Sequence, residues 1–509
     1  MMITYICHER ITPSVRSGDE YMPFREYDQS QTKIAWINYR GMLGEDHPAV
    51  IINDVVEYLG TEDIEQRYGE IGNPPYHPKL MVKTLIYGYS QGYFGGRPIY
   101  NNFMNDLGLR YLTNDDFPDH RTINLFRITF KDEFAEIFAK VVTLCIDLGL
   151  IGFENLAIDS QKLKANANLF QNKNMKGIQR ELERIKKEIL KLLEQDLSSD
   201  LQAIEQKRTM ELLERRQKKL EEALIVLKAA GGENDPNIRF NLTDPESKVM
   251  TDKTGAKHPD YLVQNAVDDK CQVVTAFEVT NIPTDVGQLE PMKEASKKNT
   301  GRSHKHTAAD AGYSTKEEYP RMASDPDTEY FVPDRTKESS KKDPYSKWKF
   351  KYVPEHDVFI CPNNKVVYLA RVIEEDGREV LVYEAEDCTG CPFGKHCLGK
   401  TKQGDENPSH NRTITIYPED EYIKAMRTKL DSEAGKAIYQ RRMATVEPFH
   451  GDIQKNRGFR QFNLRGLEKV NIEYCILSIA HNIRKIRLHA RSVFYDLFHK
   501  KSSCAIAAT

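Results

Sequence analysis

The sequence predicts an α/β protein in which helical regions surround a mixed sheet. Short apolar strands around residues 155–159, 261–267 and 271–280 alternate with stretches of helical apolar spacing. A long charged stretch, residues 174–230, repeats Leu and Ile three and four residues apart, as packed helices do. A length of 509 residues exceeds one compact core, so we expect two to four domains.

The composition is that of a soluble globular protein, with 39% hydrophobic and 29% charged residues. No apolar stretch approaches the ~20 residues of a membrane span, and no charged-then-apolar leader follows Met1. We therefore expect a cytoplasmic protein without a membrane partner. A net charge of −3 is unlike that of a simple DNA-coating protein, but residues 441–501 are rich in Arg and Lys and offer a local basic surface.

Residues 1–150 are predicted to form a helical N-terminal domain. Pro78 suits a helix start, apolar residues recur after it at helical spacing, and Gly92 breaks the pattern. Another helix opens at Asp119 and carries Arg121. Short helices joined by glycine turns suit a helix-turn-helix-like DNA-binding module with Arg121 as a candidate contact, although an ordinary helical bundle fits the same pattern.

The rest of the chain is predicted to be a core domain of strands and helices with two insertions. Alternating strands and helices, and a late stripe of isoleucines that should pack a long helix on the sheet, mark the core. The charged stretch is interrupted at Ser198, Ser199 and Asp200, which predicts a helical hairpin that is a dimerisation arm or only a spacer. The predicted limits are 151–335 and 430–495 for the core, 170–235 for the hairpin, 336–429 for a small Cys-rich β insertion and 496–509 for a C-terminal tail.

Three acidic residues are the candidates for catalysis. Asp159 ends a short apolar strand, Asp310 follows another strand and precedes a helix, and Glu447 lies in the late helical region. Each alone suits an ordinary structural role, and Asp268 and Asp269 are set aside because they occupy a hairpin turn, where Asp is favoured. Together, converging carboxylates can hold paired Mg²⁺ ions, which activate an attacking oxygen and stabilise a leaving one.

Four of the nine cysteines cluster in the sequence, and the other five are scattered. A C-x-x-C on a glycine turn, with two further cysteines nearby in a reducing compartment, favours structural Zn²⁺ over disulfides, with unliganded thiols as the alternative. Four thiolates leave no open position on zinc, so we expect no catalytic role. The clustered residues are Cys361, Cys388, Cys391 and Cys397.

Several segments resemble those of bacterial insertion-sequence transposases of the DDE type. The segments are 157–168, 309–313 and 439–460, and the helical stretch 77–127 is similar to the N-terminal domain of these enzymes. The resemblance runs from about Phe24 to Leu488. It implies an RNase H-like core in which the first strand carries Asp159, the fourth ends at Asp310, and a late helix carries Glu447.

The resemblance also implies residues that touch the DNA of the transposon ends. Tyr439 and Arg442 match a tyrosine and an arginine that precede the family's glutamate. The lysine that follows this glutamate is replaced by Gln454, and Lys455 lies one residue on, near the same helix face. A proline disfavours helical geometry in the residue before it, so Pro448 predicts a kink at the glutamate.

The segment 458–466 contains both arginines and aromatic residues, a combination that can bind phosphates and stack on bases, although a basic loop closing over the core fits as well. The candidate DNA contacts in and beside this segment are Arg457, Arg460 and Arg465.

The function that follows is DNA transposition. We expect the protein to cut and join the ends of an insertion sequence, with two Mg²⁺ or Mn²⁺ ions about 3.5–4 Å apart on the three acids. It would bind the terminal inverted repeats and target DNA as a homodimer or higher oligomer, in the bacterial cytoplasm at the nucleoid. The alternatives are an RNase H-like nuclease without strand transfer and a catalytically inactive, domesticated DNA-binding protein.

Overall fold

The structure is a computed structural model, and it describes residues 37–68, 75–195, 199–252, 254–335, 343–375, 377–398 and 410–507. Tyr39–Thr509 form one compact unit, and Met1–Asn38 form another, of which only Ile37 and Asn38 are described. Phe24, where the resemblance begins, lies outside the described residues. Within the described ranges, no helix is both long enough and apolar enough to cross a membrane.

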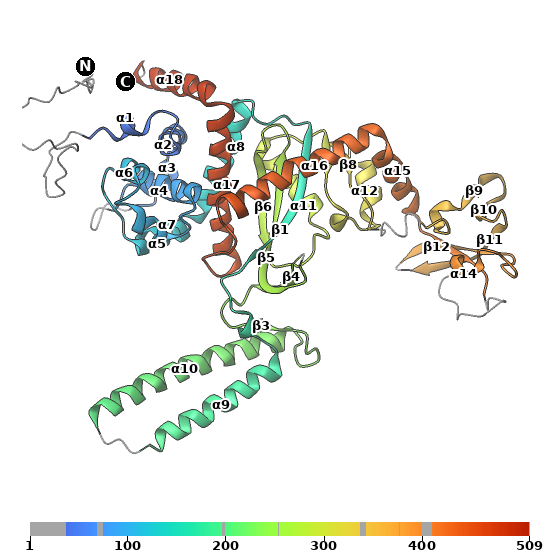
Figure 1. Cartoon of the computed structure of the whole chain (residues 1–509), viewed down its shortest axis with the longest axis horizontal. Helices are drawn as coiled ribbons and strands as arrows, with labels where there is room; N and C mark the ends of the chain where they lie inside the picture. Colours follow the sequence, from blue (N-terminus) through green and yellow to red (C-terminus); the bar gives the residue numbers. More distant parts are fainter. Residues whose placement is uncertain are drawn as a thin grey trace, which may run out of the picture. The chain divides into compact units, whose positions relative to one another are not determined.

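A six-stranded mixed sheet lies at the centre of the larger unit (Figure 1). The strand order is β4-β5-β1-β7-β8, and β6 pairs with β5. β5 runs antiparallel to β1 and β6, whereas β1, β7 and β8 run parallel, which confirms the predicted mixed α/β class. The strands are β1 (Asn155–Lys164), β4 (Lys248–Thr251), β5 (Lys257–Asp268), β6 (Val274–Thr280), β7 (His306–Ala308) and β8 (Glu329–Phe331).

The two faces of the sheet belong to different cores, because successive side chains of a strand point to opposite faces. Ala157 and Leu163 of β1 join the core that includes α17 (Leu467–His489), with its predicted isoleucine stripe buried. Leu156 and Ile158 join the core on the other face, with α11 (Leu289–Thr300) and α12 (Glu318–Ser324). Asp159 has the parity of Ala157 and therefore belongs to the α17 face.

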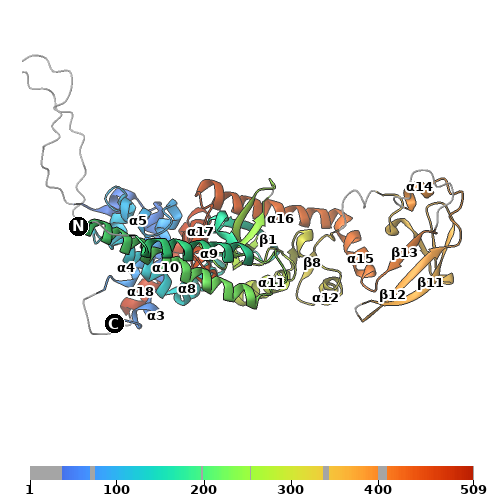
Figure 2. The ribbon, with the colours of Figure 1, turned by 90° about the horizontal axis from the view of Figure 1, so that it is seen from below.

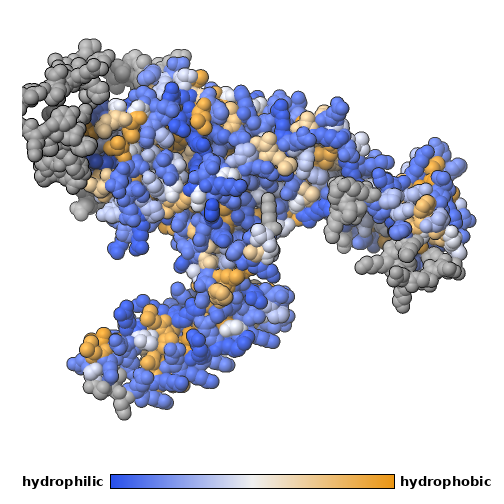
Figure 3. All heavy atoms as spheres, viewed as in Figure 1, coloured by the Kyte–Doolittle hydropathy of each residue, from blue (hydrophilic) through white to orange (hydrophobic). Residues whose placement is uncertain are grey.

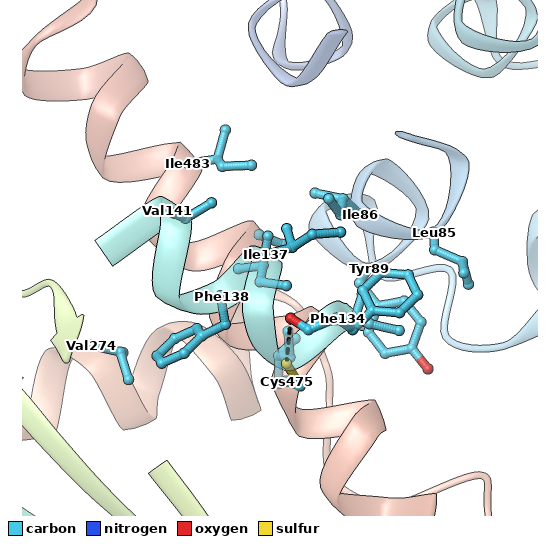
Figure 4. Packing of buried hydrophobic residues seen from close by; sticks show 14 of the residues in the cluster. Leu85, Ile86, Tyr89, Phe134, Ile137, Phe138, Val141, Val274, Cys475 and Ile483 are labelled. Atoms are coloured by element: carbon cyan, nitrogen blue, oxygen red, sulfur yellow. Dashed lines mark hydrogen bonds between the residues drawn. The ribbon is translucent and has the colours of Figure 1, made fainter. Parts of the chain in front are cut away.

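The helices before residue 150 share the core of the sheet. Buried side chains from α2, α4, α7 and α8 form one continuous cluster with α17, β5 and β6. Figure 4 shows Phe134 of α8 toward Tyr89 of α4, and Phe138 toward Val274 of β6. The predicted division at residue 150 therefore does not separate two cores. These helices are α1 (Tyr39–Leu43), α2 (Pro48–Leu59), α3 (Glu62–Glu65), α4 (Pro78–Gln91), α5 (Gly96–Asn102), α6 (Leu107–Thr113), α7 (His120–Thr129) and α8 (Lys131–Asp147).

The predicted helical hairpin is present between β1 and β5. α9 (Met175–Leu193) and α10 (Asp200–Ala229) pack through their own cluster of Leu and Ile, and β2 (Asn172–Lys173) pairs with β3 (Phe240–Asn241) at the base (Figure 1). Ser199 caps α10 by accepting a hydrogen bond from the Gln202 amide. Ser198, part of the predicted interruption, lies outside the described residues.

A second, five-stranded sheet follows β8 and carries the clustered cysteines. Its order is β13-β12-β11-β10-β9, and the predicted hairpin is β11 with β12. Arg378 of β12 pairs with Glu317 and Glu419, which ties this sheet to the segments that begin α12 and α15. The strands of this sheet are β9 (Lys351–Val353), β10 (Val358–Ile360), β11 (Val366–Glu375), β12 (Arg378–Ala385) and β13 (Thr413–Ile416), and α14 (Gly394–Cys397) lies between β12 and β13 in sequence. The helices after β13, besides α17, are α15 (Asp420–Asp431), α16 (Glu433–Gly451) and α18 (Arg491–Ala507).

A buried charged pair joins the N-terminal helices to α17. Arg127 lies 3.4 Å from Glu473, and both side chains are almost completely buried. Glu473 also accepts hydrogen bonds from the Tyr89 hydroxyl and the backbone amides of Asn463 and Leu464. This buried group of Glu473 and its donors stabilises the fold only while every member is present. Removing the charge of Glu473 would leave the buried charge of Arg127 uncompensated.

We predict that Glu473→Gln lowers the free energy of unfolding by about 3–5 kcal/mol, because Arg127 keeps its buried charge. Glu468→Gln, at an exposed position of the same helix, should change it by less than about 0.5 kcal/mol. Urea unfolding followed by fluorescence measures both. Equal, small effects of the two substitutions would show that the pair does not hold these helices together.

Candidate catalytic site

Asp159 lies within β1, not at its end as the sequence suggested. The strand continues to Lys164 because Gln161 and Leu163 turn inward on the same face as Asp159 while polar neighbours point outward. The Asp159 carboxylate is mostly buried, with 20% of its side chain exposed. Across from it, α16 places Arg442 Nη1 at 3.5 Å and His450 Nδ1 at 3.9 Å, and α16 packs along β1 (Figure 2).

Asp310 is brought to Asp159 by the register of two parallel strands. Ala157 of β1 pairs with Ala308 of β7, so Asp310, two residues beyond Ala308, follows at the level of Asp159. Asp310 accepts a hydrogen bond of 2.8 Å from the Gly312 amide and caps the short helix η2 (Ala311–Tyr313).

The helix after Asp310 begins slightly later than predicted. α12 starts at Glu318 after Glu317 as its N-cap residue, and the hydrogen bond found at this turn is from the Thr315 amide to Glu318, at 3.0 Å, instead of the predicted capping box of Ser314 with Glu317.

Neighbouring charges influence the ionisation of Asp159. Burial raises the pKa of Asp159 to about 6, Arg442 opposes the rise, and the charges of Asp310 and Asp285 add to it. Tyr439 of α16 responds to the same groups: burial raises the pKa of its hydroxyl, with Arg442 opposing and Asp310 contributing. Strands and α16 therefore bring Asp159, Asp310, Tyr439 and Arg442 into one site.

Asp285 belongs to this site, although the sequence did not single it out. It lies between β6 and α11, and Gln264 of β5 donates a 2.8 Å hydrogen bond to its Oδ1. A Cβ atom on Gly312 would stand 2.9 Å from Asp310 Oδ1 and 3.1 Å from Asp285 Oδ2. No regular pattern surrounds Asp285, so only the folded chain shows that the two carboxylates are neighbours.

Glu447 lies on α16, the same helix as Arg442 and His450, and its side chain is exposed. His450 is one helical turn further along and contacts Asp159, so Glu447 lies near the site along the helix. Among the residues that the structure describes, no three His, Cys, Asp or Glu side chains already form a group that could hold a metal ion. The convergence of Glu447 with the two aspartates therefore stays a prediction.

At Pro448, where the sequence predicts a kink, α16 keeps its helical hydrogen-bonding pattern and continues to Gly451. A proline has no N–H to donate to the carbonyl four residues earlier, here that of Ala444. Gln272 Nε2 donates to that carbonyl instead, at 3.2 Å. The distortion comes later, where Asp452–Asn456 form a wide π-helical turn.

Asp452 fixes that turn from inside. Arg457 Nη2 lies 3.0 Å from its carboxylate, Arg484 also pairs with it, and His481 lies at 3.6 Å. Burial opposes ionisation of Asp452, but His481 and the two arginines hold its pKa well below the usual range. Arg457 is 5% exposed and directed to this carboxylate, so its burial removes it from the candidate DNA contacts.

Four of the remaining candidate DNA contacts lie on the surface. Lys455, Arg460, Arg465 and Arg121 are all exposed. Gln454, at the position of the family's lysine, donates a 3.2 Å hydrogen bond to Gln161 of β1, two residues from Asp159. Gln454 therefore places an amide beside β1, and the nearest positive charge in sequence, Lys455, lies on the surface.

The four clustered cysteines line one hollow of about 20 Å³ beside β12 and α14. Burial raises the pKa of Cys397, and the other three thiols lie near enough to raise it further. The Lys365 amide donates to Cys361 Sγ and the Arg412 amide to Cys388 Sγ, both at 3.3 Å. All four of these cysteines are free thiols.

Two family models match the chain. Residues 360–487 match a transposase DDE domain, and residues 37–129 match the transposase domain DUF772. The first match contains Glu447 and the four clustered cysteines, and the second contains Arg121. No curated protein and no solved structure matches the chain. The two matches confirm the resemblance to insertion-sequence transposases of the DDE type, and they indicate DNA transposition as the process.

The raised pKa of Asp159 predicts that this residue lowers the free energy of unfolding at neutral pH. The folded protein holds the proton more tightly than the unfolded chain, so stability falls as the pH rises from about 4 to about 6. Asp159→Asn cannot ionise, and in EDTA at pH 7.5 it should be about 1–3 kcal/mol more stable than the unchanged protein.

Urea unfolding at several pH values measures this difference, which should shrink toward pH 4. If the variant were less stable than the unchanged protein by the same amount at every pH, the raised pKa assigned to the buried Asp159 would be contradicted.

Proposed function

We propose that this protein is a DNA transposase that cuts and joins the ends of an insertion sequence. The observation that carries the proposal is the register of β1 and β7, which sets Asp159 and Asp310 at the same level beside the helix that holds Tyr439, Arg442 and Glu447. Counted in chain order and without the edge strand β4, the central sheet is formed by β1, β5, β6, β7 and β8. β1 is then the first strand and β7 the fourth, which supports the RNase H-like core implied by the resemblance.

The donor chemistry of the site fits Mg²⁺ or Mn²⁺. Asp159, Asp310 and Glu447 offer oxygen ligands, and the mutual repulsion of buried carboxylates is relieved by a cation. Two bound ions would supply the activation of water or a 3′-hydroxyl and the stabilisation of the leaving oxygen. The protein's own part is to hold the carboxylates on strands and a packed helix, which fixes their positions before DNA arrives.

Phosphate binding falls to the residues around the acids. Arg442 lies beside Asp159 with its guanidinium over the Tyr439 ring at 5.5 Å, a position from which both can meet the backbone of a cleaved end. Lys455, Arg460 and Arg465 extend this surface, and Arg121 at the start of α7 would meet the inverted repeat farther away. Arg457 is left out because it is buried.

Joining two ends calls for a homodimer or higher assembly, and the helical hairpin is a candidate arm for it. Apolar side chains stay exposed on α9 and α10, and Figure 3 shows them among charged neighbours. The exposed residues near its tip are Leu190, Leu193, Leu201 and Ile204. The proposed location is the bacterial cytoplasm, where the DNA substrate lies at the nucleoid.

We predict that Asp159→Asn, Asp310→Asn and Glu447→Gln each reduce cleavage of the element's ends by roughly 10³-fold or more, because each removes a charge that would hold the ions. Binding of end DNA should change little. Glu433→Gln, at the other end of α16, is the matched control and should cleave normally. Gel assays of cleavage and binding give both readouts, and robust cleavage by the Glu447 variant would remove that residue from the site.

A strand-transfer assay with pre-cut ends separates the proposal from its alternatives. A transposase joins such ends to target DNA, whereas an RNase H-like nuclease yields no joined product. A domesticated DNA-binding protein would bind the ends without cutting them in Mg²⁺ or Mn²⁺. Gln454, in place of the family's lysine, favours a domesticated DNA-binding protein. The retained Asp159, Asp310 and Glu447 favour a transposase.

We also propose that the clustered cysteines bind one structural Zn²⁺. The four thiols line one hollow, and amide donors to Cys361 and Cys388 would stabilise thiolates. This small sheet has a modest core of its own, so a metal would add stability that its few buried apolar residues supply only in part.

For zinc, we predict about one ion per chain in protein purified without chelators, and a loss of most of it in Cys388→Ser. Cys271→Ser, outside the cluster, should keep its zinc. Elemental analysis by mass spectrometry counts the metal. Unchanged protein without zinc, or equal loss in both variants, would contradict the assignment.

A further inference from the structure

Asp285 and Asp310 are held close together although they come from different loops. The position of a Cβ on Gly312 is 2.9 Å from Asp310 Oδ1 and 3.1 Å from Asp285 Oδ2, and the sum of these distances bounds the separation of the two oxygens at 6.0 Å. Only a residue without a side chain leaves this space to the carboxylates. Two oxygens on one Mg²⁺, each about 2.1 Å from it, are at most about 4.2 Å apart, so a small movement would let both bind the same ion.

Asp285 is also oriented by buried partners. Gln264 donates to Asp285 Oδ1, and the buried Tyr313 hydroxyl donates in turn to Gln264 Oε1. Gln264 pairs in register with Ser160, the neighbour of Asp159, and Tyr313 ends the short helix that Asp310 caps. These hydrogen bonds connect Asp285 to the segments that carry both predicted aspartates, and they leave its Oδ2 directed toward Gly312.

A further observation points to a ligand beside these carboxylates. The Arg442 side chain is only 10% exposed and its Nη1 lies 3.5 Å from Asp159 Oδ2, yet its Nε and Nη1 make no hydrogen bond among the described residues. A buried guanidinium beside the acids, with N–H donors still available, matches a divalent cation with a phosphate bound to it.

We propose that Asp285 is a further metal-binding residue of this site, and that it shares a divalent cation with Asp310. The inference rests on the proposed transposase function and extends its ligand set. Gly312 is then required because a methyl group there would press on both carboxylates.

Asp285→Asn tests the assignment, because the amide keeps the shape and can still accept from Gln264 while the charge is lost. Binding of Mn²⁺ to the full chain, measured by the electron paramagnetic resonance of free Mn²⁺, should weaken at least about tenfold. Cleavage of end DNA should need correspondingly more Mn²⁺. Glu278→Gln, an exposed acid on β6, is the control and should behave like the unchanged protein.

Gly312→Ala gives a second test that leaves every carboxylate in place, and it should weaken Mn²⁺ binding in the same direction. Normal Mn²⁺ binding by both variants, with binding lost in Asp159→Asn, would overturn the role of Asp285 and leave the proposed function standing. Unchanged protein that neither binds Mn²⁺ nor cuts its ends would overturn both.

Discussion

Carboxylates gathered in a mostly buried place repel one another, and the structure must hold them there against that repulsion. The parallel register of β1 and β7 does so for Asp159 and Asp310, because it fixes the two backbones at the same level. The cost appears in the pKa of Asp159, which burial and neighbouring acids raise to about 6. Arg442 offsets part of it, and a divalent cation would offset more.

The helix opposite the strands is fixed by different means. Val446 and Phe449 of α16, and Ile453 of the turn after it, are buried in the core shared with α17. Gln272 satisfies the carbonyl that Pro448 leaves without a donor, and Asp452 anchors the π-helical turn through Arg457, Arg484 and His481. These contacts hold the helix that carries Glu447, Arg442 and Tyr439 in one position beside β1.

Regular patterns made much of the fold predictable. Apolar strands, the leucine spacing of the hairpin and the isoleucine stripe of α17 all depend on local periodicity, and the structure confirms them. The site was less predictable, because it depends on contacts between distant segments. Asp285 lies in a loop without periodicity, and Arg457 looked like a surface arginine until the fold placed Asp452 beside it.

The central claim is that strands and α16 bring their acids around shared divalent ions. Anomalous scattering from Mn²⁺, in a crystal of the protein with a pre-cut transposon end, tests it most directly. We predict manganese bound by Asp159 and Asp310, with Glu447 of the same chain as a further ligand and Arg442 on the DNA phosphate. Manganese bound elsewhere, or bound with Glu447 turned away to solvent, would contradict the account.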